Sequence, residues 1–184
     1  MLEFPIKTER LVLRPFEARD LYDVHAYRSL REVNRYLYSE PYTEDQTAEN
    51  LAKWIGQDDI QEDGQSLALA IVLPEEDEVI GEVDLKLLSV EHRQAETGYI
   101  LHPAYWGHGF ATEAARETLR IGFQDYDLHR IQAECDARNE PSRQVMERLN
   151  MRREAHLKHH EIFKGEWGDS YVYAMLAEEY RDQK

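Results

Sequence analysis

The stretch 102–114, HPAYWGHGFATEA, constrains the fold of this chain more than any other part of the sequence. It follows an apolar segment, 95–101, whose short length and flanks are typical of a strand. It leads into 111–124, where apolar residues recur at the spacing of one helix face. Between them stand Gly107 and Gly109, two of the nine glycines in the chain. A strand that passes through a glycine turn into a helix requires a fold in which strands and helices pack together.

This turn is also a candidate anion site. The first amides of a helix have no partner within the helix, and the helix dipole places partial positive charge beside them. Glycine allows unusual dihedral angles and the close approach of a phosphate. The candidate donors are the main-chain N–H groups of Gly107, His108, Gly109, Phe110, Ala111 and Thr112. The alternative interpretation is a tight strand-to-helix connection that binds no ligand.

Length and charge limit the class of protein. The 184 residues, 42% of them apolar, predict a single domain over 1–184 with one substantial core. The net charge of −15 disfavours nucleic acid and anionic membranes as partners and favours a cation such as an amine. Solubility or a salt-adapted host explains the same charge. No apolar run approaches the ~20 residues of a membrane helix, and the first residues show no signal segment, so we expect a cytoplasmic protein.

The periodicity of the rest of the chain predicts an α+β domain with a mixed sheet. We expect strands at 8–15, 67–73, 79–88, 95–101, 129–137, 154–163 and 170–176. We expect helices after Asp20, after Thr43, at 111–124 and at 141–149. Thr43 and Gln46 have the spacing of a capping box, and the helix behind them is expected to bury Leu51, Trp54 and Ile55. Asp20 is expected to cap the helix that follows it.

A second motif follows the alternating strand 129–137. Asn139 and Ser142 open a helix about thirty residues after Trp106-Gly-His-Gly-Phe-Ala111. With these two motifs in this order, the chain resembles the GNAT family of acyl-CoA N-acyltransferases. Asn150 stands where that family usually has glycine, and asparagine also adopts the left-handed conformation that ends a helix. The opening TERLVLRP and the late GEWGD, 165–169, are similar to the branch that acetylates the N-terminal alanine of ribosomal proteins.

The resemblance implies a fold and an activity. The fold is a mixed, mostly antiparallel sheet flanked by helices, with a splayed strand pair that forms the acetyl-CoA cleft. The activity is direct transfer of the acetyl group of acetyl-CoA to a primary amine, with the N-terminal α-amine of a protein as the expected acceptor. The alternatives are a small amine (a polyamine, an amino acid or an aminoglycoside) and a non-catalytic sensor that binds acyl-CoA. A homodimer is compatible with the resemblance.

The resemblance also assigns residues to the donor. Main-chain groups of Ile100, Leu101 and His102 are implied to hold the pantetheine arm and the developing oxyanion. Asn139 is implied to bond the pantetheine arm, and Arg143 to meet a CoA phosphate.

The reaction needs a base and an acid, because a free amine is protonated near neutral pH and the leaving thiolate takes up a proton. We expect Glu96 to be the base, since it precedes the turn by one strand length and shares a face with Gly98 and Ile100. Glu82 and Asp84 are rivals. Many family members use a tyrosine as the general acid at the position where this chain has Met146. Methionine has no proton to donate, so the resemblance points to Ser142 as the acid.

Three other features have a structural and a functional interpretation. The single cysteine, Cys135, suggests an acyl-cysteine route, but its place on the apolar face of a strand favours a buried thiol. His156, His159 and His160 suggest a metal site, but no further ligand stands at a recognisable spacing, and we expect no metal. Trp54 and Trp167 suit either an acceptor pocket or core packing.

Overall fold

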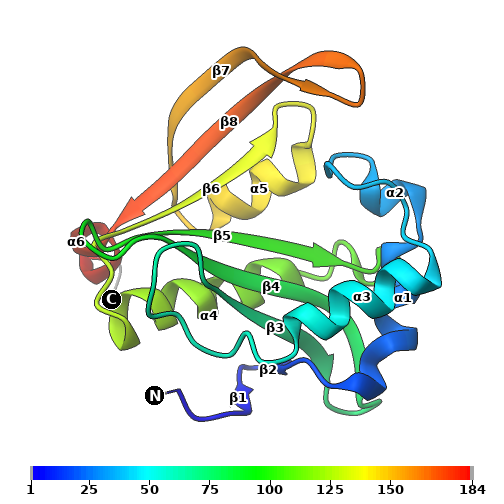
Figure 1. The fold of residues 1–184 in the computed structure, drawn as a ribbon. Coiled ribbons are helices and arrows are strands. Elements are labelled where there is room, and N and C mark those ends of the chain that lie inside the picture. The colour runs from blue at the N-terminus through cyan, green and yellow to red at the C-terminus, as the bar shows by residue number, and fades with distance from the viewer. Residues whose placement is uncertain (1, 183–184) are drawn as a thin grey trace.

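The computed structural model describes residues 2–182, and its centre is an eight-stranded sheet (Figure 1). The strands are β1 (Ile6–Lys7), β2 (Val12–Pro15), β3 (Ser66–Leu73), β4 (Glu78–Ser89), β5 (Gln94–Leu101), β6 (Arg130–Asp136), β7 (Arg152–Phe163) and β8 (Glu166–Leu176). Their order is β1-β2-β3-β4-β5-β6-β8-β7. Every neighbouring pair is antiparallel except β5 and β6, which run parallel. The mixed, mostly antiparallel sheet is therefore confirmed.

Helices cover both faces of the sheet. They are α1 (Leu21–Arg28), α2 (Arg31–Asn34), α3 (Glu44–Trp54), α4 (Phe110–Arg120), α5 (Glu140–Arg148) and α6 (Ala177–Asp182). Leu119 of α4 and Met146 of α5 belong to one buried apolar cluster, and Val24 of α1 and Leu51 of α3 belong to another. The sheet therefore separates two cores, one under α4 and α5 and one under the first three helices.

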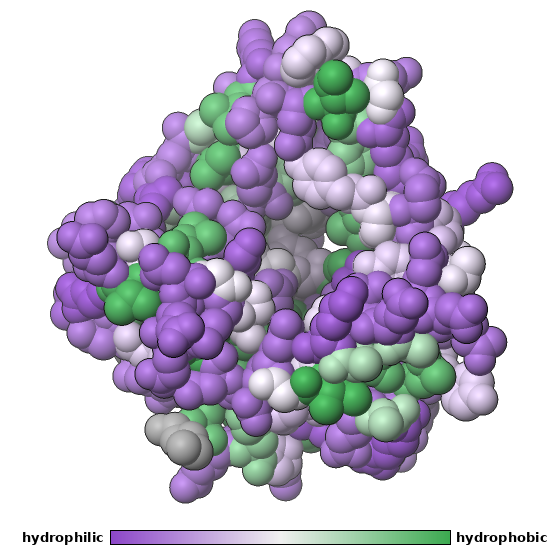
Figure 2. All heavy atoms as spheres, viewed as in Figure 1, coloured by the Kyte–Doolittle hydropathy of each residue, from purple (hydrophilic) through white to green (hydrophobic). Residues whose placement is uncertain are grey.

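The strands β5 and β6 pair only at one end. The paired residues are Gln94 with Arg130, Ala95 with Ile131 and Glu96 with Gln132. Beyond Glu96, β5 continues to Leu101 while β6 turns away toward α5 (Figure 1). Figure 2 shows a hollow at the centre of this face, where the two strands separate in Figure 1. The expected splayed pair is present, and it opens the sheet beside the glycine turn.

Local signals predicted several elements correctly. Thr43 Oγ1 accepts from the Gln46 amide at 3.2 Å, and Gln46 Oε1 accepts from the Thr43 amide at 2.9 Å, which is the expected capping box. Asn150 has φ of 60° and ends α5, as predicted. The Met151 amide then bonds the Met146 carbonyl at 3.0 Å, closing a Schellman motif.

Other expectations were wrong. The Asp20 side chain does not cap α1; it is buried and accepts hydrogen bonds from the Arg14 guanidinium and the Glu17 amide, because a buried carboxylate needs a counter-charge and donors. Ile55 lies beyond the end of α3 and is 41% exposed. The strand expected at 8–15 is shorter and forms β2, which begins at Val12, because residues 8–11 form a turn in which the Thr8 amide bonds the Leu11 carbonyl.

Candidate active site

The glycine turn holds its main chain in conformations that favour glycine. Gly107 has φ of 79° and Gly109 has φ of 82°, and Gly109 is the N-cap of α4. A glycine N-cap has no side chain to bond the first helical amides, so those of Phe110, Ala111 and Thr112 point out from the end of the helix. The sequence expectation of a row of bare N–H groups at this end agrees with this geometry.

Thr112 adds an unsatisfied polar atom to the same helix end. Its hydroxyl oxygen is buried, and within residues 2–182 it has no hydrogen-bond partner. A buried polar group without a partner costs about 1–3 kcal/mol. An anion with oxygen acceptors at the helix N-terminus satisfies both the hydroxyl and the amides. The residues present therefore fit the diphosphate of a nucleotide cofactor.

Arg10 holds the turn from outside. Its guanidinium donates to the His108 carbonyl at 2.9 Å and to Glu113 of α4 at 2.8 Å, and it lies over the Phe110 ring at 4.6 Å. The His108 ring lies alongside Phe110, with centroids 5.8 Å apart. Arg10 therefore fixes the direction of the His108 carbonyl. No local pattern predicts this contact, because it joins segments about a hundred positions apart.

The main chain of β5 alternates between two neighbours. The His102 amide donates to the Ile80 carbonyl of β4 at 2.8 Å. Because main-chain groups alternate along an antiparallel strand, those of Ile100 also face β4, while those of Tyr99 and Leu101 face the gap. The Leu101 carbonyl accepts from the Trp106 indole at 2.9 Å. Of the three predicted donors, Leu101 is thus the one whose amide is directed into the gap.

An acidic row lies beside the gap on the face of helices α1 and α3. Residues paired across β4 and β5 share a face, and the pairs here are Glu82 with Ile100, Asp84 with Gly98, and Lys86 with Glu96. The row therefore carries the carboxylates of Glu82, Asp84 and Glu96, with the exposed Lys86 beside Glu96.

Two members of this row are bound to neighbours. Glu82 forms an ion pair with Arg28 and accepts from the Tyr27 phenol at 2.8 Å. Glu96 accepts from Gln132 of β6 at 2.9 Å, at the last paired position before the strands separate.

Asp84 differs from both. Its carboxylate leans over Gly98, where an added Cβ would lie 2.7 Å from Oδ1. Burial raises the pKa of the Asp84 carboxyl to about 7, with repulsion from Glu82 and Glu96 adding to the shift. A carboxyl that titrates near neutral pH beside a cleft suits a proton acceptor.

The start of α5 faces the gap from the other side. The Asn139 side chain caps the helix by accepting from the Ser142 amide at 3.3 Å. The Ser142 hydroxyl lies 3.0 Å from the Tyr99 phenol of β5. Arg143, the expected phosphate ligand, forms ion pairs with Glu140 and Glu147 of its own helix.

The other candidate groups have structural partners. Cys135 is buried, and burial raises the pKa of its thiol to about 11, so the thiol stays protonated near neutral pH. His156 lies 2.8 Å from Asp169, and in the described part of the chain no three potential ligands are grouped for a metal. Trp54 packs on Phe16 at 5.4 Å, whereas Trp167 is 61% exposed on the hairpin formed by β7 and β8.

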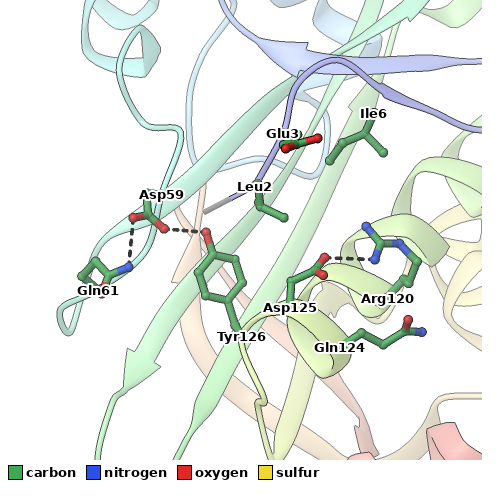
Figure 3. A pocket seen from close by; sticks show the side chains of 9 residues that line it. All are labelled: Leu2, Glu3, Ile6, Asp59, Gln61, Arg120, Gln124, Asp125 and Tyr126. Carbon is green, nitrogen blue, oxygen red and sulfur yellow. Dashed lines mark hydrogen bonds and ion pairs between the residues drawn. The ribbon is translucent and has the colours of Figure 1, made fainter.

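Two cavities lie outside this site. One of about 560 Å³ lies at the far end of α4, where Arg120 pairs with Asp125 and Tyr126 donates to Asp59 (Figure 3). Another, of about 490 Å³, is lined by Arg31, Glu40, Pro41 and Lys164. Neither includes a residue of the glycine turn or of the acidic row. In residues 2–182, no helix is both long and apolar enough to span a membrane.

Comparison with known proteins agrees with this geometry. Residues 10–152 match the acetyltransferase (GNAT) domain model. The chain is 35% identical to the N-acetyltransferase p20 of Bacillus licheniformis, over 94% of this chain and 96% of p20. A GNAT-family acetyltransferase of Bacillus anthracis superposes with a TM-score of 0.86 at 36% identity, covering 95% of this chain and 99% of that one.

A third relative has been solved with ligands. The spermidine N-acetyltransferase of Vibrio cholerae, in complex with CoA and spermine, superposes with a TM-score of 0.80 at 25% identity, covering 95% of this chain and 99% of that one. The glycine turn, the splayed strands and the extent of these matches lead to one conclusion. The chain belongs to the GNAT family of acetyltransferases and is an N-acetyltransferase that uses acetyl-CoA as its acetyl donor.

Proposed function

We propose that the acceptor is a primary amine of a small, flexible molecule that carries more than one positive charge, such as a polyamine. The observation that carries this proposal is the acidic row of Glu82, Asp84 and Glu96 on one face beside the gap between β5 and β6. Opposite charge in a cleft raises the local concentration of a cationic ligand. The Vibrio cholerae relative, solved with spermine, supports an acceptor of this kind.

The far side of the hollow favours a slender acceptor. Lys164 on the hairpin of β7 and β8 donates to the carbonyls of Asn34 at 2.9 Å and Ser39 at 3.2 Å. Nearby, the Tyr38 phenol bonds Glu161 and its ring meets Phe163 edge-on. These contacts bridge the hairpin to the segment between α2 and α3. A flexible chain passes such a bridge more readily than the surface of a folded protein.

Asp84 is the proposed base. Its carboxylate accepts a proton from the bound ammonium group, directly or through water, so that the nitrogen lone pair can attack the thioester carbonyl. Glu82 and Glu96 attract the cation and are bonded to neighbours of their own. The expectation that Glu96 is the base therefore gives way, in this proposal, to its rival Asp84.

The donor is proposed to lie between the glycine turn and α5. Main-chain amides from Gly107 to Thr112 bond the diphosphate of CoA, and the Thr112 hydroxyl gains the partner that it lacks. Amides of β5 that face the gap, at Tyr99 and Leu101, stabilise the developing oxyanion. Ser142 gives its hydroxyl proton to the leaving thiolate and regains one, through water, from the acceptor nitrogen, which loses its second proton as the amide forms. Asn139 positions Ser142 by capping the same helix turn.

The N-terminal α-amine of a protein is the second candidate acceptor. It rests on the opening TERLVLRP and on residues 165–169, which are similar to the ribosomal-protein branch. An α-amine has a pKa of ~8, so it demands less of a base than an amine of pKa ~10.

Thiol release from acetyl-CoA tests the proposal with a matched acceptor pair. Butane-1,4-diamine and butylamine share the same carbon chain and differ by one terminal ammonium group. Spermidine, amino acids, an aminoglycoside and peptides with free α-amines complete the panel. We expect kcat/KM to be at least about tenfold higher for the diamine, which corresponds to one added charge contact of ~1.4 kcal/mol. Equal values for the pair, or turnover of peptides alone, contradict the small polycation as acceptor.

A further inference from the structure

The opening motif TERLVLRP, residues 8–15, is fastened to the helix that begins at the glycine turn. The Thr8 hydroxyl donates to Glu113 Oε1 at 2.6 Å, and the Arg10 amide donates to the same oxygen at 2.8 Å. The Arg10 guanidinium meets the other oxygen, Oε2, with Nε at 2.8 Å and Nη2 at 2.7 Å. Glu113 belongs to the first turn of α4. The start of the chain and the start of α4 are therefore joined through one carboxylate.

This carboxylate holds the Arg10 guanidinium in one place. Burial raises the pKa of the Glu113 carboxyl, but donation from Thr8 and Arg10 outweighs it, so the pKa lies below its ordinary value. Glu113 is therefore ionised near neutral pH. Exposed ion pairs contribute little to order, whereas a guanidinium that bonds a half-buried carboxylate through two nitrogens has a defined orientation.

The third guanidinium nitrogen reaches the glycine turn. Arg10 Nη1 donates to the His108 carbonyl at 2.9 Å. The peptide bond between His108 and Gly109 is trans, and in a trans peptide the carbonyl and the following N–H point in opposite directions. The Gly109 N–H therefore points away from Arg10. This direction leaves the N–H for a ligand on the other side of the turn.

Glycine itself does not select this direction. Rotation of the peptide unit between residues 108 and 109 reverses both its carbonyl and its N–H, and it changes φ of Gly109. Glycine adopts positive and negative φ about equally well, so the observed φ of 82° is one of two accessible states. A Cβ added at Gly109 would lie 3.5 Å from Arg10 Nη2, which places the guanidinium against this residue. The bond from Arg10 to the carbonyl is thus a contact that favours one state.

We propose that Arg10 is a positioning residue for acetyl-CoA, which holds the His108 carbonyl and so keeps the Gly109 N–H turned toward the diphosphate of the donor. This rests on the donor binding proposed at the glycine turn. The forked shape of the guanidinium is required, because it bonds a carboxylate and a carbonyl at once. Lysine keeps the charge but has one donor nitrogen on a flexible stem.

Titration of CoA into the unmodified chain, Arg10→Met and Arg10→Lys tests the proposal. Arg10→Met is expected to weaken CoA binding about tenfold, as for one lost hydrogen bond to a charged group. KM for acetyl-CoA should rise by a similar factor, while kcat at saturating acetyl-CoA stays within about twofold, because Arg10 touches no reacting atom. Arg10→Lys is expected to lose at least about half of the same binding free energy. Full affinity in Arg10→Lys overturns the proposal, because charge alone then suffices.

Arg93→Met is the matched control for the loss of a positive charge. The Arg93 guanidinium also donates to a carboxylate and to a main-chain carbonyl, both of Asp127, at 2.6 and 3.3 Å. Its side chain is 53% exposed and that of Arg10 is 44% exposed. Arg93 precedes β5, whereas the glycine turn follows it. CoA affinity is expected to stay unchanged in Arg93→Met, and an equal loss in the two methionine variants contradicts positioning.

The double variant Arg10→Met with Glu113→Gln separates positioning from neutralisation. If Arg10 only cancels the charge of Glu113 near the donor, removing that charge should restore the affinity of Arg10→Met. Positioning predicts no recovery beyond about twofold, since the His108 carbonyl still lacks its donor. Recovery to the affinity of the unmodified chain therefore overturns the proposal.

Gly109→Val distinguishes this proposal from the one on which it rests. Weak CoA binding in Gly109→Val together with normal binding in Arg10→Met leaves the glycine turn as the donor site and overturns only the role of Arg10. Normal binding in both variants overturns donor binding at the turn as well. Thermal unfolding midpoints, measured in parallel, show whether each variant is folded. Arg10→Lys keeps the opposite charge beside Glu113, so it tests the carbonyl contact even where Arg10→Met is less stable.

Discussion

At the scale of single residues, the three carboxylates of the acidic row have different surroundings although they share one face of the sheet. Glu82 and Glu96 each accept a hydrogen bond from a side chain of another element, whereas the half-buried Asp84 lies against Gly98 of the neighbouring strand. The sequence predicts that these carboxylates share a site but ranks Glu96 first. Ranking them requires the contacts of Arg28 and Gln132, which come from other elements.

Asp84→Asn is expected to remove the pH dependence of acetyl transfer. In the unmodified protein, kcat/KM should fall as the pH drops through about 7, where the Asp84 carboxyl takes up its proton. Asparagine accepts no proton, so the variant should lose this inflection and about 100-fold or more in kcat/KM. Glu96→Gln is the matched control and should keep the inflection. The measurement is a pH–rate profile of each variant with one acceptor. An inflection that persists in Asp84→Asn and is lost in Glu96→Gln would identify Glu96 as the base.

The same substitution has a consequence for stability. A carboxyl whose pKa is raised from 3.8 to about 7 on folding binds more protons in the folded chain than in the unfolded chain within that window. Its contribution therefore falls as the pH rises through the window and is lost above it. Asp84→Asn should raise the urea midpoint more at about pH 8 than at about pH 5. An equal change at both values contradicts the raised pKa.

At the scale of elements, local patterns predicted most of the strands and the capped helices. The clean alternation of β6 is confirmed, with Ile131, Ala133 and Cys135 all buried. The helix expected at 111–124 begins at Phe110 and continues beyond Arg120 as a wider π turn over Ile121–Asp125. That turn and α6 could not be predicted, because both depend on packing against distant segments rather than on their own periodicity.

Gly98→Ala tests how β5 positions the carboxylate of β4. A Cβ at Gly98 would approach Asp84 Oδ1 to 2.7 Å, so the carboxylate must move while the strand pairing stays intact. We expect kcat to fall about tenfold or more, as for other small displacements of a catalytic group. Gly168→Ala, in β8, is the matched control, since the nearest side-chain atom, in Phe163, is 3.5 Å from its added Cβ. Equal activity in the two variants contradicts the placement of Asp84.

At the scale of the whole molecule, two features lie beyond any local pattern. The separation of β5 from β6 was expected from the family resemblance alone, and the order of the strands was not predicted, because non-local pairing leaves no trace in periodicity. The residues that hold the site together were missed for the same reason. Arg10 reaches α4 from the first residues of the chain, and Tyr99 reaches α5 across the gap.

Because the chain has a net charge of −15, an anionic donor must be bound by local groups such as the amides of the glycine turn. The field of such a protein repels an anionic donor and attracts a cationic acceptor. Binding of CoA must therefore come from short-range groups, and the described residues offer them at the start of α4. In the proposed function, the acidic row attracts the cationic acceptor and the bare amides bind the anionic donor.

Calorimetric titration of CoA measures whether the glycine turn binds the donor. Three folded proteins are compared, which are the unmodified chain, Gly109→Val and Gly56→Val. Both glycines have positive φ, 82° and 86°, so the backbone strain is matched, but only Gly109 lies at the turn. Gly109→Val is expected to weaken CoA binding at least about tenfold, or ~1.4 kcal/mol, and Gly56→Val is expected to leave it unchanged. A folded Gly109→Val protein that binds CoA as tightly as the unmodified chain would contradict donor binding at the turn.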